Sequence, residues 1–166
     1  ANRTGVDQHP VNCIDWTQAV AFCRYRGAQL PTEAQWEYAA RGTDGRTYPW
    51  GNEAPGSQLC WNSISNPVST CPVGSYPTGA SPFGLLDMAG NVWEWTGDNH
   101  ADYPVQTASP ISDPTGPADG TYRVVRGDGW LLTHADWVRA AQRLRKRPAE
   151  RDNTVGFRCA RAGPVR

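Results

Sequence analysis

Glycine and proline are the residues that most restrict what this chain can fold into. It holds 17 Gly and 14 Pro among its 166 residues. Proline breaks helices and central strands, and glycine weakens both, so much of the backbone must form loops and turns. A helical bundle is therefore excluded. We expect an α+β domain with little regular structure.

The chain nevertheless has enough apolar residues for a real core. Hydrophobic residues make up 39% of it, with 8 Trp, which is too apolar and aromatic for a disordered chain. Its length suits one domain of ordinary size. Because no apolar run approaches the ~20 residues of a membrane-spanning helix, we expect no membrane span. We treat residues 1–166 as a single domain.

Charge is balanced overall but unevenly placed. Residues 1–120 carry 5 Lys and Arg against 12 Asp and Glu, whereas residues 121–166 carry 11 against 4. One interpretation is that the C-terminal arginines pair with the acidic half inside the fold, since arginine suits planar carboxylates. The other is a basic surface for an acidic partner. A general nucleic-acid binder would be basic overall, so we expect no nucleic-acid partner.

The sequence predicts two short helices. Asp15 is expected to cap a helix over about 16–26, where apolar residues recur at i, i+3, i+4 and i+7. Thr32 and Gln35 form a capping-box pattern at the start of a second helix, which ends near residue 41. Short strands are expected at 91–96, 122–126 and 155–161, and an exposed loop at 99–120.

The five cysteines suggest disulfides rather than a metal site. No pair has C-x-x-C spacing and the three histidines are scattered, which argues against a zinc site. Cys60 and Cys71 bracket a short loop that suits a local disulfide. Five is odd, so one thiol is free or pairs outside the chain. Bridged cysteines would indicate an oxidising, extracytoplasmic compartment: periplasm, cell surface or secretion.

Several long motifs occur in a fixed order along nearly the whole chain. They begin at Pro10-Val11-Asn12 and continue with Leu30-Pro31-Thr32-Glu33-Ala34-Gln35-Trp36-Glu37, Tyr48-Pro49-Trp50-Gly51-Asn52, Gly84-Leu85-Leu86-Asp87-Met88-Ala89-Gly90-Asn91-Val92-Trp93-Glu94-Trp95, Arg123-Val124-Val125-Arg126-Gly127 and Gly156-Phe157-Arg158-Cys159. Together they resemble the formylglycine-generating-enzyme, or sulfatase-modifying-factor, domain family.

That resemblance implies a loop-rich variant of the C-type-lectin-like fold, with two short helices, small twisted antiparallel sheets, and loops held by metal and disulfides. Members of the family carry an N-terminal segment before the Pro-Val motif. The resemblance therefore implies that residues 1–166 are a single domain of this family lacking that segment, and that Cys13 has lost its partner with it.

The resemblance also implies two stabilising features. The first is a disulfide between Cys23 and Cys159. The second is a calcium site, in which the family's loop supplies side-chain oxygens at its first and last positions and backbone carbonyls between them. The alternative for Glu94 is a simple ion pair with an arginine. The implied calcium ligands are Asp87, Gly90, Val92 and Glu94.

Activity does not carry over with the scaffold. In the family, two cysteines hold the copper that oxidises a substrate cysteine, since thiolates suit Cu(I). The first aligns here with Leu132 and the second falls near Trp137, and no cysteine stands between Cys71 and Cys159. The related iron-dependent sulfoxide synthases take their histidines from a separate helical domain. We therefore expect a protein that is not an enzyme.

A binding surface is the remaining expectation. In other lineages of this domain, including the variable proteins of diversity-generating retroelements, the segment before the Gly-Phe-Arg motif is exposed and binds ligand. The corresponding residues are Leu131, Leu132, Thr133, His134, Asp136, Trp137, Gln142, Leu144, Arg145, Lys146 and Arg147. Trp137 and the leucines would be apolar anchors, and the arginines directional polar contacts.

The sequence thus predicts a non-catalytic, calcium-bound module that presents residues 131–147 to a protein or other macromolecule outside the cytoplasm. The alternatives are a structural subunit of a larger extracytoplasmic assembly, and a residual metal-dependent oxidase that modifies sulfatases.

Overall fold

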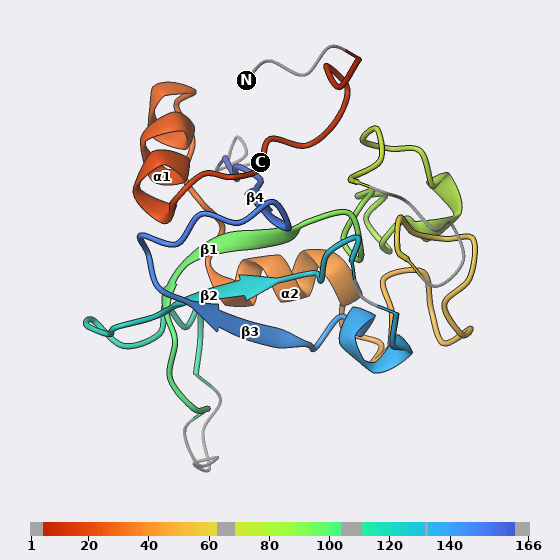
Figure 1. Cartoon of the computed structure of the whole chain (residues 1–166). Helices are drawn as coiled ribbons and strands as arrows, with labels where there is room; N and C mark the ends of the chain where they lie inside the picture. Colours follow the sequence, from red (N-terminus) through yellow and green to blue (C-terminus); the bar gives the residue numbers. More distant parts are fainter. Residues whose placement is uncertain (1–4, 63–68, 104–110, 132, 162–166) are drawn as a thin grey trace.

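The computed structural model describes residues 5–62, 69–103, 111–131 and 133–161. Long loops connect its regular elements, which gather around one small sheet (Figure 1). The elements are α1 (Trp16–Tyr25), α2 (Glu33–Arg41), the 3-10 turn η1 (Pro77–Gly79), β1 (Trp93–Asn99), β2 (Arg123–Arg126), the 3-10 turn η2 (Ala135–Val138), β3 (Arg143–Lys146) and β4 (Val155–Phe157).

Both predicted helices are confirmed, each with a complete capping box. Asp15 accepts from the Gln18 backbone N–H while the Gln18 side chain accepts from the Asp15 N–H. Thr32 and Gln35 make the same reciprocal pair at α2. These side chains satisfy backbone groups that a helix start leaves open, which fixes where each helix begins.

The sheet differs from the expected small antiparallel sheets. Its four strands lie in the order β3-β2-β1-β4. β2 is antiparallel to both β1 and β3, but β4 runs parallel to β1. The antiparallel expectation is therefore wrong for one pairing, and the sheet is mixed. β3 and β4 lie at opposite edges of the sheet and both run in the direction of β1, so the chain crosses from one edge to the other between them.

β1 is the central strand and its two faces pack against different helices. Trp93 and Trp95 join the core cluster of α1, which includes Ala19 and Cys23. On the opposite face, Glu94 accepts a hydrogen bond from Trp36 of α2. Side chains alternate along a strand, so one strand supplies both layers. This places Glu94 and its neighbours deep in the molecule.

Four C-terminal arginines, Arg126, Arg143, Arg151 and Arg158, pair with carboxylates of the acidic half, as the first interpretation of the charge pattern predicts. Arg126 of β2 is fully buried and donates to Glu33 and Glu37 of α2 at 3.3 and 2.7 Å. Arg143 of β3 donates to both oxygens of Glu33, at 2.7 and 2.6 Å. These pairs fasten α2 to the sheet.

Within the described residues, no helix combines the length and apolar character that crossing a membrane requires.

Candidate functional site

Two disulfides stabilise the region around the predicted calcium-binding turn. Cys23 of α1 is bonded to Cys159, which follows β4, across 136 residues of sequence. Cys60 is bonded to Cys71 across a separation of 11. Both predicted pairings are confirmed. The remaining cysteine, Cys13, is free and exposed.

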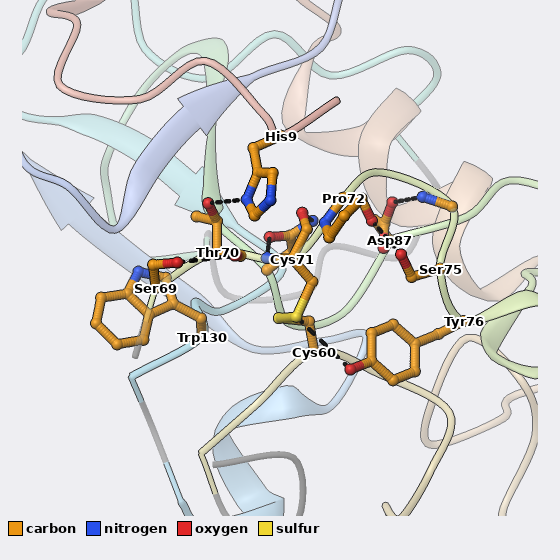
Figure 2. The surroundings of a disulfide bond; sticks show 12 residues. His9, Cys60, Ser69, Thr70, Cys71, Pro72, Ser75, Tyr76, Asp87 and Trp130 are labelled. Atoms are coloured by element: carbon orange, nitrogen blue, oxygen red, sulfur yellow. Dashed lines mark hydrogen bonds between the residues drawn. A yellow bond between two sulfur atoms is a disulfide. The ribbon is translucent and has the colours of Figure 1, made fainter. Parts of the chain in front are cut away.

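Asn91 ties the second disulfide to the turn that precedes β1. Its Oδ1 accepts from the Cys71 backbone N–H at 3.1 Å, and its Nδ2 donates to the Cys71 carbonyl at 3.2 Å. Asn91 is buried and holds a positive φ of 64°. On the other side of the same loop, Asp87 accepts from the Gly74 N–H at 2.7 Å (Figure 2). The turn from Asp87 to Asn91 is therefore held in place by the disulfide loop.

The four residues predicted to bind calcium lie on this turn and the start of β1. Gly90, Val92 and Glu94 are buried, and Asp87 is partly buried. Burial raises the pKa of the Asp87 carboxyl, the nearby Glu94 raises it further, and the Gly74 N–H and Arg158 oppose this. A neighbouring cation would relieve the cost of ionising Asp87 there.

Glu94 itself already has a counter-ion, Arg158. Arg158 donates to its Oε2 through Nε at 2.6 Å and to its Oε1 through Nη2 at 2.7 Å. The Trp36 Nε1–H donates to Oε2 at 2.7 Å. This is the arginine pairing that the alternative for Glu94 predicts, and it occupies much of the acceptor capacity of the carboxylate.

The oxygen atoms at these four residues are nevertheless of the kind that calcium binds. Among the hydrogen bonds between described residues, none ends on the carbonyl oxygen of Gly90 or Val92. Two such carbonyls, the Asp87 carboxylate and the spare capacity of Glu94 make an all-oxygen set, which calcium prefers. These residues would hold the ion, which would neutralise Asp87 and fix the turn. Calcium stays a prediction.

A cavity of about 800 Å³ opens beside this turn. Its walls are mainly apolar and come from the segment before α1, from α1, from residues 73–74 and 86–94, and from the segment around β4. Its charged residues are Asp87, Glu94 and Arg158, and Gln18 and Asn91 are its other polar side chains. The apolar wall residues are Pro10, Val11, Ile14, Phe22, Val73, Leu86, Val92 and Phe157.

Asp128 is a buried carboxylate that the sequence did not single out. It follows β2, is fully buried and has a positive φ of 65°. Its Oδ1 accepts from the Gly129 N–H at 2.6 Å, while its Oδ2 has no partner within the described part of the chain. Burial raises the pKa of Asp128 to about 7. In the sequence, Asp128 is visible only as a departure from the Gly-Gly-Ser-Trp motif of the family; its burial depends on the tertiary structure.

The first half of the predicted ligand surface is exposed around η2. Leu131 is 50% and Trp137 39% exposed, and Thr133, His134 and Asp136 are also exposed. Leu132 lies outside the described residues. We call these five described residues the Trp137 surface. It has the apolar anchors and polar rim that binding surfaces commonly share.

The second half of the predicted surface lies along β3 and is not continuous with the first. β3 starts near η2 and leads away from it (Figure 1). Arg145 and Arg147 are exposed, whereas Gln142 and Lys146 are partly buried. Leu144 is partly buried and packs against the core cluster of α1 and β1, because side chains alternate between the two faces of a strand. Its role as a ligand contact stays a prediction.

Comparison with known proteins identifies the family. The model of the sulfatase-modifying factor enzyme 1-like domain matches residues 1–163. The chain belongs to this family. It is 41% identical over 174 residues to the formylglycine-generating enzyme of Streptomyces coelicolor, covering 95% of this chain and 54% of that protein. The chain thus spans about half the length of that relative.

The chain is also similar to proteins with other names. A serine/threonine-protein kinase pkn1 of Chlamydia caviae is 43% identical over 159 residues, which cover 95% of this chain and 25% of that protein. Among solved structures, Treponema denticola variable protein 1 superposes with a TM-score of 0.77 at 25% identity, over 95% of this chain and 73% of that one. The α+β, C-type-lectin-like class is thereby confirmed, and the family includes proteins named as enzymes.

Proposed function

We propose that this sulfatase-modifying-factor domain is a non-catalytic binding module that presents its Trp137 surface to a protein or other macromolecule. The observation that carries the proposal is the state of the cysteines. Four of the five are closed in disulfides and the fifth, Cys13, is alone. A copper site built from two thiolates of this chain cannot form while those disulfides are intact.

The scaffold supports this role because it holds the exposed segment on a rigid frame. Val138, at the end of η2, is buried in a cluster with Tyr48 and Leu59. The Ala140 N–H donates to the Thr47 carbonyl at 2.9 Å. A surface anchored in this way loses little conformational freedom on binding, which favours affinity.

Calcium and an extracytoplasmic location belong to the same proposal. The all-oxygen set at Asp87, Gly90, Val92 and Glu94 would bind calcium and stiffen the turn that the Cys60–Cys71 loop holds. Two disulfides are consistent with an oxidising compartment.

The proposal is tested in two arms. The first loads the protein with Cu(I) and measures bound copper by elemental analysis; we expect far less than one copper per chain, and stoichiometric copper would contradict a non-catalytic role. The second selects protein binders from a display library and maps them with Trp137→Ala. Selected binders should lose affinity with Trp137→Ala and keep it with Tyr25→Ala, which removes an aromatic ring that is 85% exposed on α1. Equal effects would exclude the Trp137 surface as the preferred site.

The enzyme alternative is favoured by the names of several relatives, which are formylglycine-generating enzymes 36% to 41% identical to this chain. If the chain were a formylglycine-generating enzyme, it would need a reactive centre other than a pair of cysteines between Cys71 and Cys159, because that segment contains none.

A further inference from the structure

Two arginines at the end of β3 share one tyrosine ring. The guanidinium carbon of Arg145 lies 5.0 Å from the centroid of the Tyr122 ring, and that of Arg147 lies 5.8 Å from it. Both arginines are exposed and Tyr122 is partly buried. A ring attracts a guanidinium and orients it, but it carries no net charge. Both cations therefore stay available to an anion.

Arg145 and Arg147 differ from the neighbouring cations of β3 because no carboxylate in the described part of the chain pairs with them. Arg143, two residues before Arg145, is held by Glu33 at 2.6 Å. Lys146, on the other face of β3, is held by Asp152 at 2.8 Å. Neither Arg145 nor Arg147 forms an ion pair with any carboxylate of the described residues. Carboxylates of the described residues therefore pair with Arg143 and Lys146 but not with Arg145 or Arg147.

The pKa of a nearby histidine also indicates that Arg145 contributes positive charge to this part of the molecule. The pKa of the nearby His100 is lowered by burial first, and then by Arg143 and Arg145. Its backbone N–H donates to the Tyr122 carbonyl at 2.8 Å, so His100 is joined directly to the segment that carries the ring. Asp102 and Glu33 act in the opposite direction but do not reverse the shift.

The position of β3 in the sheet decides which shape of ligand fits. β3 is an edge strand, because the order is β3-β2-β1-β4, and it lies on the outside of the sheet (Figure 1). Arg145 is paired with Val124 and Lys146, the last residue of β3, with Arg123. Arg147 follows directly, and its guanidinium lies over the same Tyr122 ring as that of Arg145. Two residues of extended chain span roughly 7 Å. An extended chain with carboxylates at every second residue has the same spacing and could pair with the edge backbone.

We propose that the outer edge of β3 binds an extended acidic segment of a partner protein, whose alternate carboxylates pair with Arg145 and Arg147. This inference rests on the proposed binding function and names the chemistry of the second half of its surface. Cationic side chains on an edge strand also prevent pairing with other copies of the same chain. An acidic strand is the partner whose charge complements such an edge.

The experiment compares three synthetic peptides by fluorescence anisotropy at low salt. In one, Glu and Thr alternate; in the second, Gln replaces Glu; in the third, the same Glu and Thr residues are grouped into two blocks. We expect the alternating Glu peptide to bind about tenfold more tightly than either of the others, and its affinity to fall as salt is added. Equal binding of the alternating and grouped peptides would overturn the strand-like mode, and equal binding of the Glu and Gln peptides would overturn the role of charge.

Variants locate the site. Arg145→Ala with Arg147→Ala should abolish the preference for Glu at an unchanged melting temperature. Arg24→Ala with Arg26→Ala removes the same charge from exposed positions at the end of α1 and should leave the preference intact. A similar loss in both double variants would reduce the effect to net charge and contradict the proposal. Because Trp137 is untouched here, failure of this inference is distinguishable from failure of the Trp137 surface.

Discussion

Arg158 donates hydrogen bonds to both carboxylate oxygens of Glu94 and so joins the segment after β4 to strand β1. The same guanidinium donates to the carbonyls of Leu86 and Asp87 at 3.1 and 3.2 Å. One ion pair thus connects the edge strand, the core and the turn proposed to bind calcium.

Replacing Glu94 by Gln should show how much the Glu94–Arg158 ion pair contributes to the free energy of unfolding. The substitution leaves Arg158 without its carboxylate in a largely buried position, and such losses cost about 3 kcal/mol. Denaturant unfolding in the presence of a chelator measures it. Glu53→Gln, at an exposed position, is the control and should be neutral. If both variants unfolded alike, Glu94 would not be a structural anchor.

The long-range disulfide should contribute more than any other covalent feature. Closing 136 residues between Cys23 and Cys159 lowers the entropy of the unfolded chain, which corresponds to about 4–5 kcal/mol. We expect Cys23→Ala with Cys159→Ala to lose that much in free energy of unfolding. Cys13→Ala, at the exposed free thiol, should lose none. Comparable losses would argue against the entropic role of the bridge.

Asp128 should make stability depend on pH. Burial raises the pKa of Asp128 from its ordinary value of 3.8 to about 7 in the folded protein. The unfolded chain therefore loses this proton at a lower pH than the folded protein does. The folded state is favoured by the protonated group below about pH 4, and this contribution is lost as pH rises towards 7. Between pH 5 and 8 the wild type should lose about 3 kcal/mol relative to Asp128→Asn. Parallel stability curves for the two proteins would refute this.

Calcium should stabilise the protein through Asp87. At a free concentration about a hundredfold above its Kd, a bound ion adds about 2.7 kcal/mol. Thermal unfolding with calcium, and with a chelator, should therefore differ in the wild type and in Glu53→Gln, but not in Asp87→Ala, which removes the side-chain oxygen. A calcium response that persists in Asp87→Ala would place the ion elsewhere.

Local signals made the helices and one disulfide predictable. Asp15 and Thr32 cap the helices that follow them within a few residues, and Cys60 and Cys71 are close in sequence. The Cys23–Cys159 pair is too distant for such reasoning and came from the resemblance to the family. Where two interacting residues are separated by only one turn or one short loop, the sequence was enough to predict their interaction.

Features that depend on distant segments were missed. β3 carries cations at three of its four positions, so its strand character depends on pairing with β2 rather than on its own pattern. The parallel pairing of β4 depends on the path of the chain between them. The isolation of Asp128 and the shared ring of Tyr122 arise only when segments far apart in sequence meet.

The central claim is that the scaffold remains while the family's cysteine chemistry is lost. The most direct test incubates the Cu(I)-treated protein with a cysteine-containing peptide that the Streptomyces coelicolor relative converts, and measures aldehyde formation by mass spectrometry. The account predicts aldehyde with the relative and none above the protein-free blank with this chain. Repeated turnover by this chain would contradict it.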